Sequence, residues 1–180
     1  MRWLQVQLIE TVQGFNAEVN GPSAKSDGAE ASIEYSPVER LTLLLKGSYT
    51  NAKITADVPA IGARNGESLP YSPKFTGVAL GDYRFAAIGN ISPRVGLTYS
   101  YHGSQETGFS DGGRFTLPSY DSLDLRAGFD WSNYSVIARV DNVTNKFGVT
   151  SALPSLAAGY PFSGTVVRPR TFGLSLEAKF

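Results

Sequence analysis

The chain has 180 residues, of which 42% are hydrophobic and only 18% are charged, below the roughly 25% that is typical of soluble domains. Sixteen acidic and sixteen basic residues give no net charge, which excludes a broad electrostatic attraction to nucleic acid. The sequence contains no cysteine, so disulfide frameworks and thiolate metal sites are excluded as well.

Apolar and polar residues alternate along most of the chain, and a two-residue period predicts β-strands with one apolar and one polar face. Nine such segments follow one another, with no convincing helix between them. The predicted strands cover residues 2–10, 14–20, 25–36, 41–50, 69–85, 91–103, 123–131, 134–141 and 168–180. Long loops are predicted at residues 57–68, 105–118 and 144–167. From the third strand on they alternate with short turns, as the connections of outer-membrane barrels do.

The last predicted strand keeps its alternation up to the final residue. Its apolar face carries Phe172, Leu174, Leu176, Ala178 and Phe180. Chain ends exposed to water are usually polar and frayed. A last strand that is apolar and ends on an aromatic residue is expected where its outer face contacts lipid and its end lies in an interfacial aromatic belt.

Charged residues indicate which face of the strands points outward. Asp124, Arg126 and Asp130 share one face of the segment at residues 123–131. Turning that face toward hydrocarbon would cost roughly 2–4 kcal/mol for an arginine at the bilayer midplane, and less for aspartate. We therefore expect the apolar faces to contact lipid and the polar faces to line the interior, where charges of both signs would pair with one another. The inward charges are Arg94, Arg126, Arg139, Asp82, Asp124, Asp130, Asp141 and Glu177.

Aromatic residues on the outward faces gather near the strand ends and predict two interfacial girdles. At the short-turn ends these residues are Tyr35, Tyr83, Phe85, Trp131, Tyr134 and Phe180. Nearer the loop ends they are Tyr49, Tyr99, Tyr101 and Phe172.

The sequence predicts neither a transmembrane helix nor a signal peptide, because it has no run of 18 apolar residues and its first residues alternate like a strand. An exported barrel needs an export signal, and a complete bacterial barrel normally has an even number of strands. We therefore expect the chain to be the C-terminal piece of a longer one.

Four runs of the sequence together resemble the TonB-dependent outer-membrane receptors: GAEASIEYSPVERLTLLLKGSYTNAKIT (28–55), LPYSPKFTGVALGDYRF (69–85), YDSLDLRAGFDWSNYSVIARVDNVTNKFGVTSAL (120–153) and, most of all, RPRTFGLSLEAKF (168–180). The resemblance implies an all-β fold, an antiparallel transmembrane barrel of about 22 strands that encloses an N-terminal plug. Residues 1–180 would supply about nine C-terminal strands, with the plug domain and the first strands absent. By itself, such a piece is not expected to transport anything.

The resemblance also implies a function in the outer membrane of a Gram-negative bacterium. The whole receptor would import a scarce, large nutrient (a ferric siderophore, a cobalamin-like molecule or a glycan), energised through TonB. The implied partners are outer-membrane lipid and lipopolysaccharide, the barrel-assembly machinery that reads the strand ending in Phe180, the TonB complex through the missing N-terminal part, and the small-molecule substrate.

Two alternatives stay open from the sequence. One is a small, complete outer-membrane barrel with a structural or adhesive role. The other is a barrel hydrolase, which would need a nucleophile or an acid pair at the rim. A soluble β-sandwich would leave large apolar strips exposed on strands whose other face is charged, which soluble monomers rarely tolerate.

Residues that could carry chemistry are scarce, and the sequence predicts no catalytic residue, no cofactor and no metal site. His102 is the only histidine, so a pair of histidines cannot bind a metal. Aromatic and cationic residues in the expected extracellular loops are the best candidates for substrate contact. The candidates are Phe109, Arg114, Phe115, Tyr160, Phe162 and, at the outer end of a strand, His102.

Overall fold

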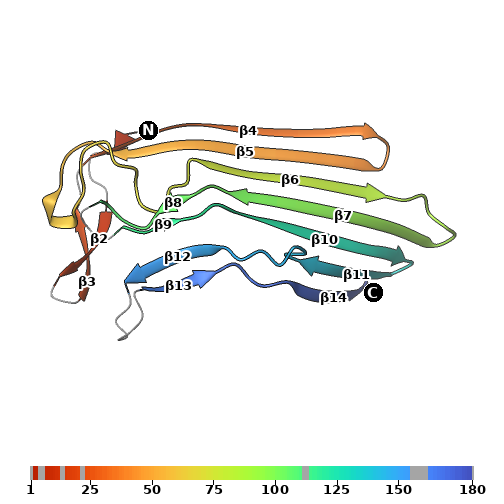
Figure 1. Ribbon diagram of the computed structural model, residues 1–180. Coiled ribbons are helices and arrows are strands. Elements are labelled where there is room, and N and C mark those ends of the chain that lie inside the picture. Colours follow the sequence, from red (N-terminus) through yellow and green to blue (C-terminus); the bar gives the residue numbers. More distant parts are fainter. Residues whose placement is uncertain are drawn as a thin grey trace.

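The computed structural model describes residues 2–3, 7–12, 15–20, 23–110, 114–154 and 162–179. Its main element is one antiparallel sheet of eight strands in the order β1-β4-β5-β6-β7-β10-β11-β14 (Figure 1). The strands are β1 (Arg2–Trp3), β4 (Ala24–Val38), β5 (Leu41–Ile54), β6 (Phe75–Arg84), β7 (Ile91–His102), β10 (Tyr120–Trp131), β11 (Tyr134–Asp141) and β14 (Thr171–Ala178). The predicted fold class, an all-β antiparallel barrel wall, is confirmed.

Three two-stranded sheets lie within the longer connections. They consist of β2 (Gln7–Val12) with β3 (Phe15–Asn20), β8 (Gln105–Glu106) with β9 (Thr116–Leu117), and β12 (Val149–Pro154) with β13 (Phe162–Val166). A single 3-10 turn, η1 (Pro59–Ile61), interrupts the connection between β5 and β6. Figure 1 shows all of these pieces at one end of the sheet, which we call the loop end, opposite the tight connections that follow β4, β6 and β10, which we call the short-turn end.

The first two predicted strands are wrong as members of the barrel wall. Only Arg2 and Trp3 join the main sheet, where they pair with Lys25 and Ala24. Residues 7–12 and 15–20 instead pair with each other as a separate hairpin. The described part of the chain therefore places eight strands, not nine, in the main sheet. Alternation predicts that a segment is extended, but it does not say which neighbour the segment pairs with.

Strand ends also differ from the prediction where local chemistry intervenes. The strand expected at residues 69–85 begins only at Phe75, because Pro70 and Pro73 have no N–H to donate to a neighbouring strand. The strand expected to end at Thr50 continues to Ile54. The loops expected at residues 105–118 and 144–167 contain the short hairpins β8–β9 and β12–β13.

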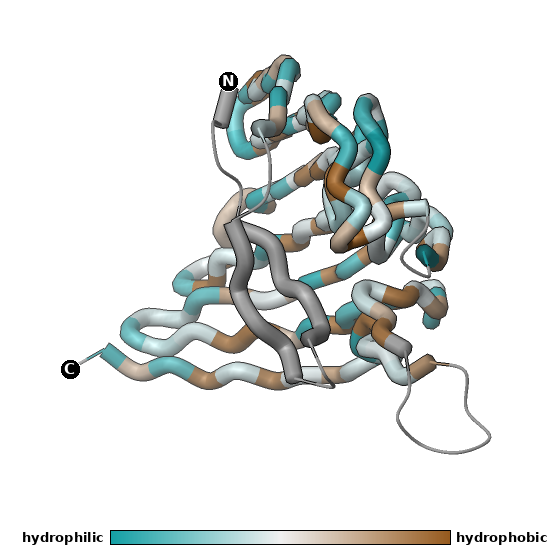
Figure 2. The backbone as a smooth tube through the Cα atoms, turned by 90° about the vertical axis from the view of Figure 1, so that its left-hand side faces the viewer, coloured by the Kyte–Doolittle hydropathy of each residue, from teal (hydrophilic) through white to brown (hydrophobic). Residues whose placement is uncertain are grey.

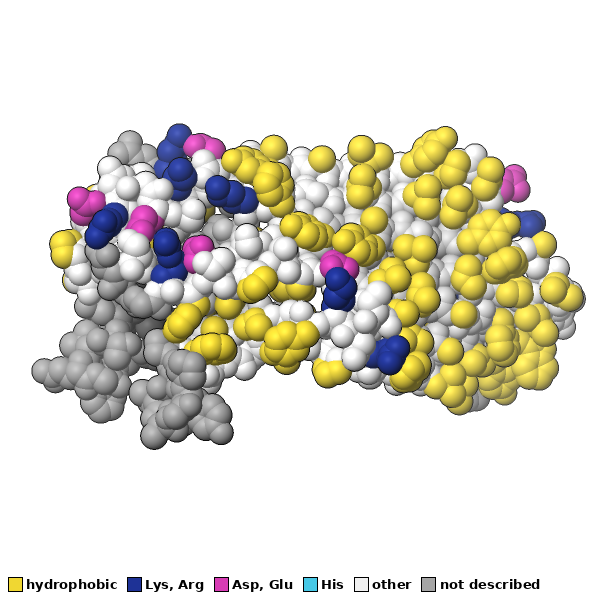
Figure 3. Space-filling model, viewed as in Figure 1, with side chains coloured by type: hydrophobic (Ala, Val, Ile, Leu, Met, Phe, Trp, Pro, Cys, Tyr) yellow, Lys and Arg dark blue, Asp and Glu magenta, His cyan; other side chains and the backbone are white. Residues whose placement is uncertain are grey.

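The two faces of the main sheet have opposite chemistry. In register across seven strands, one outward row consists of Tyr35, Leu43, Gly81, Leu97, Leu125, Val140 and Phe172. Figure 2 shows the alternation of hydrophobic and hydrophilic residues along the strands, and Figure 3 shows apolar side chains spread over the strands on one face, with most charged side chains toward the loop end.

Nothing in the described part of the chain covers this apolar face. Large apolar side chains on it stay open to solvent; for example, Leu45 is 57% exposed and Leu174 is 67% exposed. The buried apolar residues lie instead at the loop end, where Ile54, Ala63 and Phe109 form a small core. A soluble β-sandwich would cover such a face with a second layer. The apolar face is therefore suited to a hydrocarbon environment. In the residues that the structure describes, no helix has the length and hydrophobicity to cross a bilayer.

Candidate functional site: the polar face and the loop end

The polar face of the sheet is held by ion pairs that reach between strands. Arg126 on β10 contacts Asp82 on β6 with two nitrogens, Nη2 at 2.5 Å from Oδ2 and Nε at 3.2 Å from Oδ1. Arg94 on β7 donates from Nη2 to Asp130 Oδ1 at 3.3 Å and to Ser135 Oγ at 2.8 Å. The expectation that inward charges pair with one another is confirmed for these residues.

A glycine makes the pair between β10 and β6 possible. Gly96 lies directly between Arg126 and Asp82 in the register of β7. A Cβ atom at this position would lie 2.5 Å from Arg126 Nε and 2.6 Å from Asp82 Oδ1, closer than real Cβ atoms approach other atoms. The missing side chain therefore lets the guanidinium and the carboxylate meet across the intervening strand.

A hollow of about 700 Å³ lies on the polar face toward the loop end. Much of its lining carries hydroxyl groups, and Ser48 Oγ and Thr76 Oγ1 are 2.7 Å apart. At one end His102 stacks on Tyr120, with ring centroids 5.0 Å apart and planes 7° from parallel. His102 Nδ1 lies 3.1 Å from Gly103 O, and because a carbonyl only accepts, Nδ1 is the donor of this hydrogen bond.

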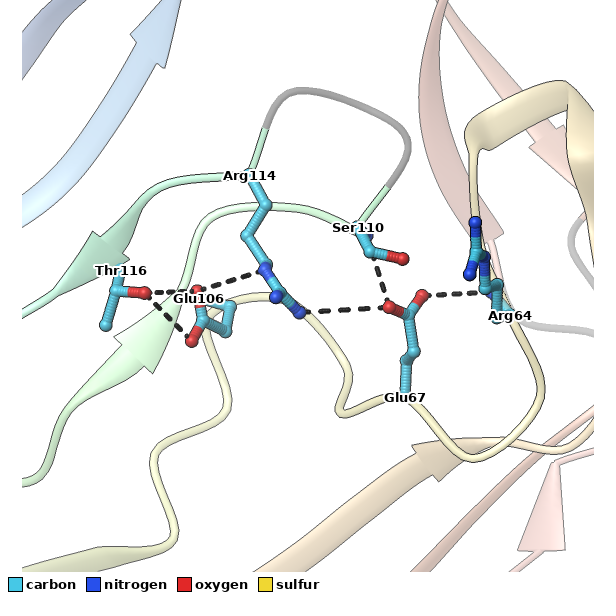
Figure 4. Close-up of polar contacts among 6 residues, drawn as sticks. All are labelled: Arg64, Glu67, Glu106, Ser110, Arg114 and Thr116. Atoms are coloured by element: carbon cyan, nitrogen blue, oxygen red, sulfur yellow. Dashed lines mark hydrogen bonds and ion pairs between the residues drawn. The ribbon is translucent and has the colours of Figure 1, made fainter.

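Ion pairs also join two of the long connections at the loop end (Figure 4). The guanidinium of Arg114 lies between Glu67, at 3.8 Å, and Glu106, at 3.7 Å. Glu67 also accepts hydrogen bonds from the backbone N–H groups of Arg64, at 2.9 Å, and Ser110, at 3.3 Å. Burial of the carboxyl raises the pKa of Glu67, but hydrogen bonds from Ser110 and Arg64 and the charge of Arg114 outweigh it, so the pKa lies below its ordinary value.

Further contacts tie the third long connection to the other two. Tyr71 donates its hydroxyl to Ala152 O at 2.8 Å, and Gln105 Nε2 donates to Thr150 O at 3.2 Å. Beneath these contacts, Phe109 packs in the small core with Ile54 and Ala63, against Val58, Ile61 and Leu69. The long connections thus form one packed layer at the loop end, which we call the loop layer.

The structure places the predicted substrate contacts in different surroundings. Phe109 is only 5% exposed, so in this conformation it offers little surface to a ligand. Arg114 is ion-paired in the loop layer, and the rings of Phe115 and Phe162 lie 5.6 Å apart. His102 lines the hollow at the loop end of the polar face, and Tyr160 lies outside the described residues. Contact of these residues with a substrate stays a prediction.

Sequence reasoning missed Tyr120 as the partner of His102. The two residues are directly opposite each other in the pairing of β10 with β7, whereas the predicted strand began only at residue 123. The alternation weakens at residues 120–122, so the sequence did not indicate that Tyr120 lies opposite His102. In the part of the chain that the structure describes, no group of three or more His, Asp or Glu side chains could hold a metal ion.

Aromatic residues predicted for the girdles lie on the apolar face at both ends of the strands. Trp131 and Tyr134 are opposite each other beside a short turn, with ring centroids 6.0 Å apart. Tyr35 and Tyr83 also lie toward the short-turn end, and Tyr99 and Tyr101 lie toward the loop end. The interfacial role of these residues stays a prediction.

The apolar residues of the final strand are described up to Ala178. Phe172, Leu174, Leu176 and Ala178 are opposite Val140, Ala138, Val136 and Tyr134 of β11, while Phe180 lies outside the described residues. Recognition of this strand by the assembly machinery stays a prediction.

Comparison with known proteins gives a family and a fold. The family model described as TonB dependent receptor-like, beta-barrel matches residues 5–143. The ferric yersiniabactin uptake receptor FyuA from Yersinia pestis is similar in structure, with a TM-score of 0.76 and 17% sequence identity over 91% of this chain and 25% of the receptor. The ferric preacinetobactin receptor BauA from Acinetobacter baumannii is similar as well, with a TM-score of 0.69 and 17% sequence identity over 98% of this chain and 26% of the receptor.

A third solved structure, the ferric-catecholate import receptor Fiu from K12 E. coli, gives a TM-score of 0.69 and 22% identity over 96% of this chain and 23% of the receptor. The chain thus spans about a quarter of the length of these receptors. No curated protein sequence is significantly similar to the chain.

Proposed function

This chain belongs to the TonB-dependent receptor β-barrel family, and from that premise we propose that it is the C-terminal portion of the barrel of a ferric siderophore receptor. Receptors of this family lie in the outer membrane of Gram-negative bacteria, and this chain is an outer-membrane protein. In the proposed receptor, the substrate passes the polar face of the sheet, and TonB supplies the energy through a plug domain.

The opposite chemistry of the two faces is the observation that carries this proposal. None of the described residues covers the apolar face, and the polar face bears ion pairs such as Arg126 with Asp82. A bilayer solvates the first face, and a water-filled passage solvates the second. Two structural neighbours are named as receptors of ferric compounds and a third as a siderophore receptor, which favours a ferric siderophore over a cobalamin-like molecule or a glycan.

The open edges of the sheet support a place in a larger barrel. Along β4, only Ala24 and Lys25 pair with β1, and β14 pairs with β11 alone among the described strands. Backbone N–H and C=O groups without partners cost several kcal/mol each in hydrocarbon, which is why membrane sheets close. The similar solved receptors are about four times as long as this chain. A receptor of that length would contain the further strands that are needed to close the sheet into a barrel.

Iron uptake tests the proposal in the organism that carries the gene. Deleting the codons of residues 1–180 should abolish uptake of at least one radioactive ferric siderophore from a panel under iron limitation, and restoring the segment should recover it. Uptake should also be lost in cells without an active TonB complex. The proposal fails if the deletion leaves uptake of every ferric siderophore unchanged in cells whose outer membrane normally contains the protein.

A further inference from the structure

The last strand of the main sheet is reached only after a long connection. β11 ends at Asp141 and β14 begins at Thr171. In between, β12 and β13 pair with each other, and among the described strands β14 is paired with β11 alone. The position of β14 along β11 is therefore set by something other than a tight turn.

The hydrophobic pattern excludes some positions of β14 but not all of them. A slip by one residue would turn its apolar side chains to the polar face. A slip by two residues keeps every side chain on its own face. If Leu174 replaced Phe172 opposite Val140, Leu176 would come to lie opposite Ala138. The outward face would stay apolar, so alternation alone permits this slip.

A turn at residues 142–146, which we call the asparagine turn, holds the chain where it returns to the sheet. Its first residue, Asn142, is only 4% exposed. Asn142 Nδ2 donates to Lys146 O at 2.9 Å and to Arg168 O at 3.0 Å, and Asn142 Oδ1 accepts from the Lys146 N–H at 2.9 Å. One buried amide therefore both shapes the turn and binds the returning chain.

Asn145 adds a second tie at the same place. Its Oδ1 accepts a hydrogen bond from the backbone N–H of Arg170 at 3.0 Å. Asn142 and Asn145 both have a φ of 51°, a left-handed conformation that asparagine adopts more readily than most residues. A two-residue slip would move residues 168–170 by about 7 Å along β11, and a hydrogen bond does not stretch that far. The asparagine turn therefore opposes the slip that alternation permits.

Arg139 opposes the same slip on the polar face. It is directly opposite Gly173, and its Nε lies 3.7 Å from Asp141 Oδ2. A Cβ atom on Gly173 would lie 2.7 Å from Arg139 Nε and 3.1 Å from Arg139 Cγ. The arginine thus occupies the space that a side chain would take at this position. The two-residue slip would bring Ser175 there, and its side chain would collide with Arg139.

We propose that Asn142, Asn145 and the contact of Arg139 with Gly173 form a register lock, which fixes the last strand in the alignment that lets the barrel close. In a closed barrel β14 also meets a strand on its other side. A slip by two residues would leave backbone groups unpaired along that seam, which is costly in hydrocarbon. The register lock acts on assembly and does not depend on which solute the receptor transports.

Engineered disulfides report the register directly, because residues 1–180 contain no cysteine. In the whole receptor isolated from outer membranes, Ile137→Cys with Ser175→Cys reports the observed alignment, and Ile137→Cys with Glu177→Cys reports the slip by two residues. Opposed residues are close enough for a disulfide, whereas positions two residues further along are too far apart. After oxidation, mass spectrometry of linked peptides should find the first disulfide at least tenfold more often than the second.

Removing the register lock should release the slip. The triple variant Asn142→Ala, Asn145→Ala and Arg139→Ala should form the slipped disulfide at least fivefold more often than the otherwise unaltered receptor. The matched control keeps both asparagine changes and replaces Arg139→Ala by Arg126→Ala, which removes the arginine directly opposite on β10; its yield should rise less than twofold. An unchanged yield in the triple variant overturns the proposal, and an equal rise in the control overturns the role of Arg139.

Refolding provides the same measurement if the triple variant does not reach the outer membrane. The two cysteine pairs are then compared in receptor refolded from urea into phosphatidylcholine vesicles. A fivefold higher yield of the slipped disulfide supports the register lock, and an unchanged yield overturns it. A receptor that takes up no ferric siderophore would refute the proposed function and leave this result as it stands.

Discussion

Leu97→Arg is the most direct test of which face of the sheet contacts lipid. Leu97 belongs to the outward row, opposite Gly81 and Leu125, and is 44% exposed. Along β7 it is four residues from Tyr101 and six from Ile91, which is opposite Trp131. At roughly 3.4 Å per residue and a tilt of about 40°, these separations are about 10 Å and about 16 Å along the membrane normal. Leu97 is thus near the middle of an apolar band about 25 Å tall.

An arginine at this depth should destabilise the folded barrel by about 2–4 kcal/mol, which lowers the folding equilibrium constant roughly 30-fold to 700-fold. The matched control is Thr98→Arg, one residue further on the polar face and opposite Asp124, which should change stability by less than about 0.5 kcal/mol. Equilibrium refolding from urea into phosphatidylcholine vesicles measures both, with tryptophan fluorescence as the signal. If the two variants are equally stable, the outward assignment of the apolar face is wrong.

Three further changes test contacts at the loop end and on the polar face. Glu67 has a pKa held below its ordinary value of 4.5, so its stabilisation of the loop layer should be complete above that pH and be lost as the pH falls through the folded-state pKa. Limited proteolysis of the loop layer should accelerate over that range. The control Glu67→Gln should be cleaved at a pH-independent rate once the pH dependence of the protease itself is corrected for. Tyr71→Phe removes the hydrogen bond to Ala152, worth about 0.5–1.5 kcal/mol, and should speed hydrogen exchange of residues 149–154 roughly 2-fold to 12-fold; unchanged exchange would contradict the contact. A double-mutant cycle of Arg126→Ala and Asp82→Ala should give a coupling free energy of only about 0.2–1 kcal/mol, because the two side chains are 40% and 39% exposed. A coupling free energy above about 2 kcal/mol would contradict a water-filled passage.

Alternation in the sequence predicted the strands of the sheet well where apolar and polar residues strictly exchange. It located β10 and β11 to within three residues, because Leu125 and Val136 could not share a face with Arg126 and Arg139. It failed at residues 7–20, which pair as a hairpin outside the main sheet although residues 15–20 alternate strictly. Periodicity reports an extended backbone on which one face differs from the other, and the pairing partner depends on contacts that are distant in sequence.

The sequence predicted which charged residues lie on the polar face, but not which of them pair with each other. The sequence indicated that Arg126 and Asp82 would both point inward, yet their contact spans an intervening strand and depends on the missing side chain of Gly96. At the loop end, the packing of Phe109 in the small core could not be read from the sequence, and its contact with a substrate stays a prediction. Loops lack the periodicity that separates inward from outward positions, so tertiary contacts among them cannot be read from one sequence.

The loop layer has a core of its own, and that core shares no side chain with the row of residues that faces the acyl chains. Substitutions in the loop layer can therefore change that end of the protein while the apolar face stays as it is. Such a division lets the loops and the wall that carries them vary independently in sequence.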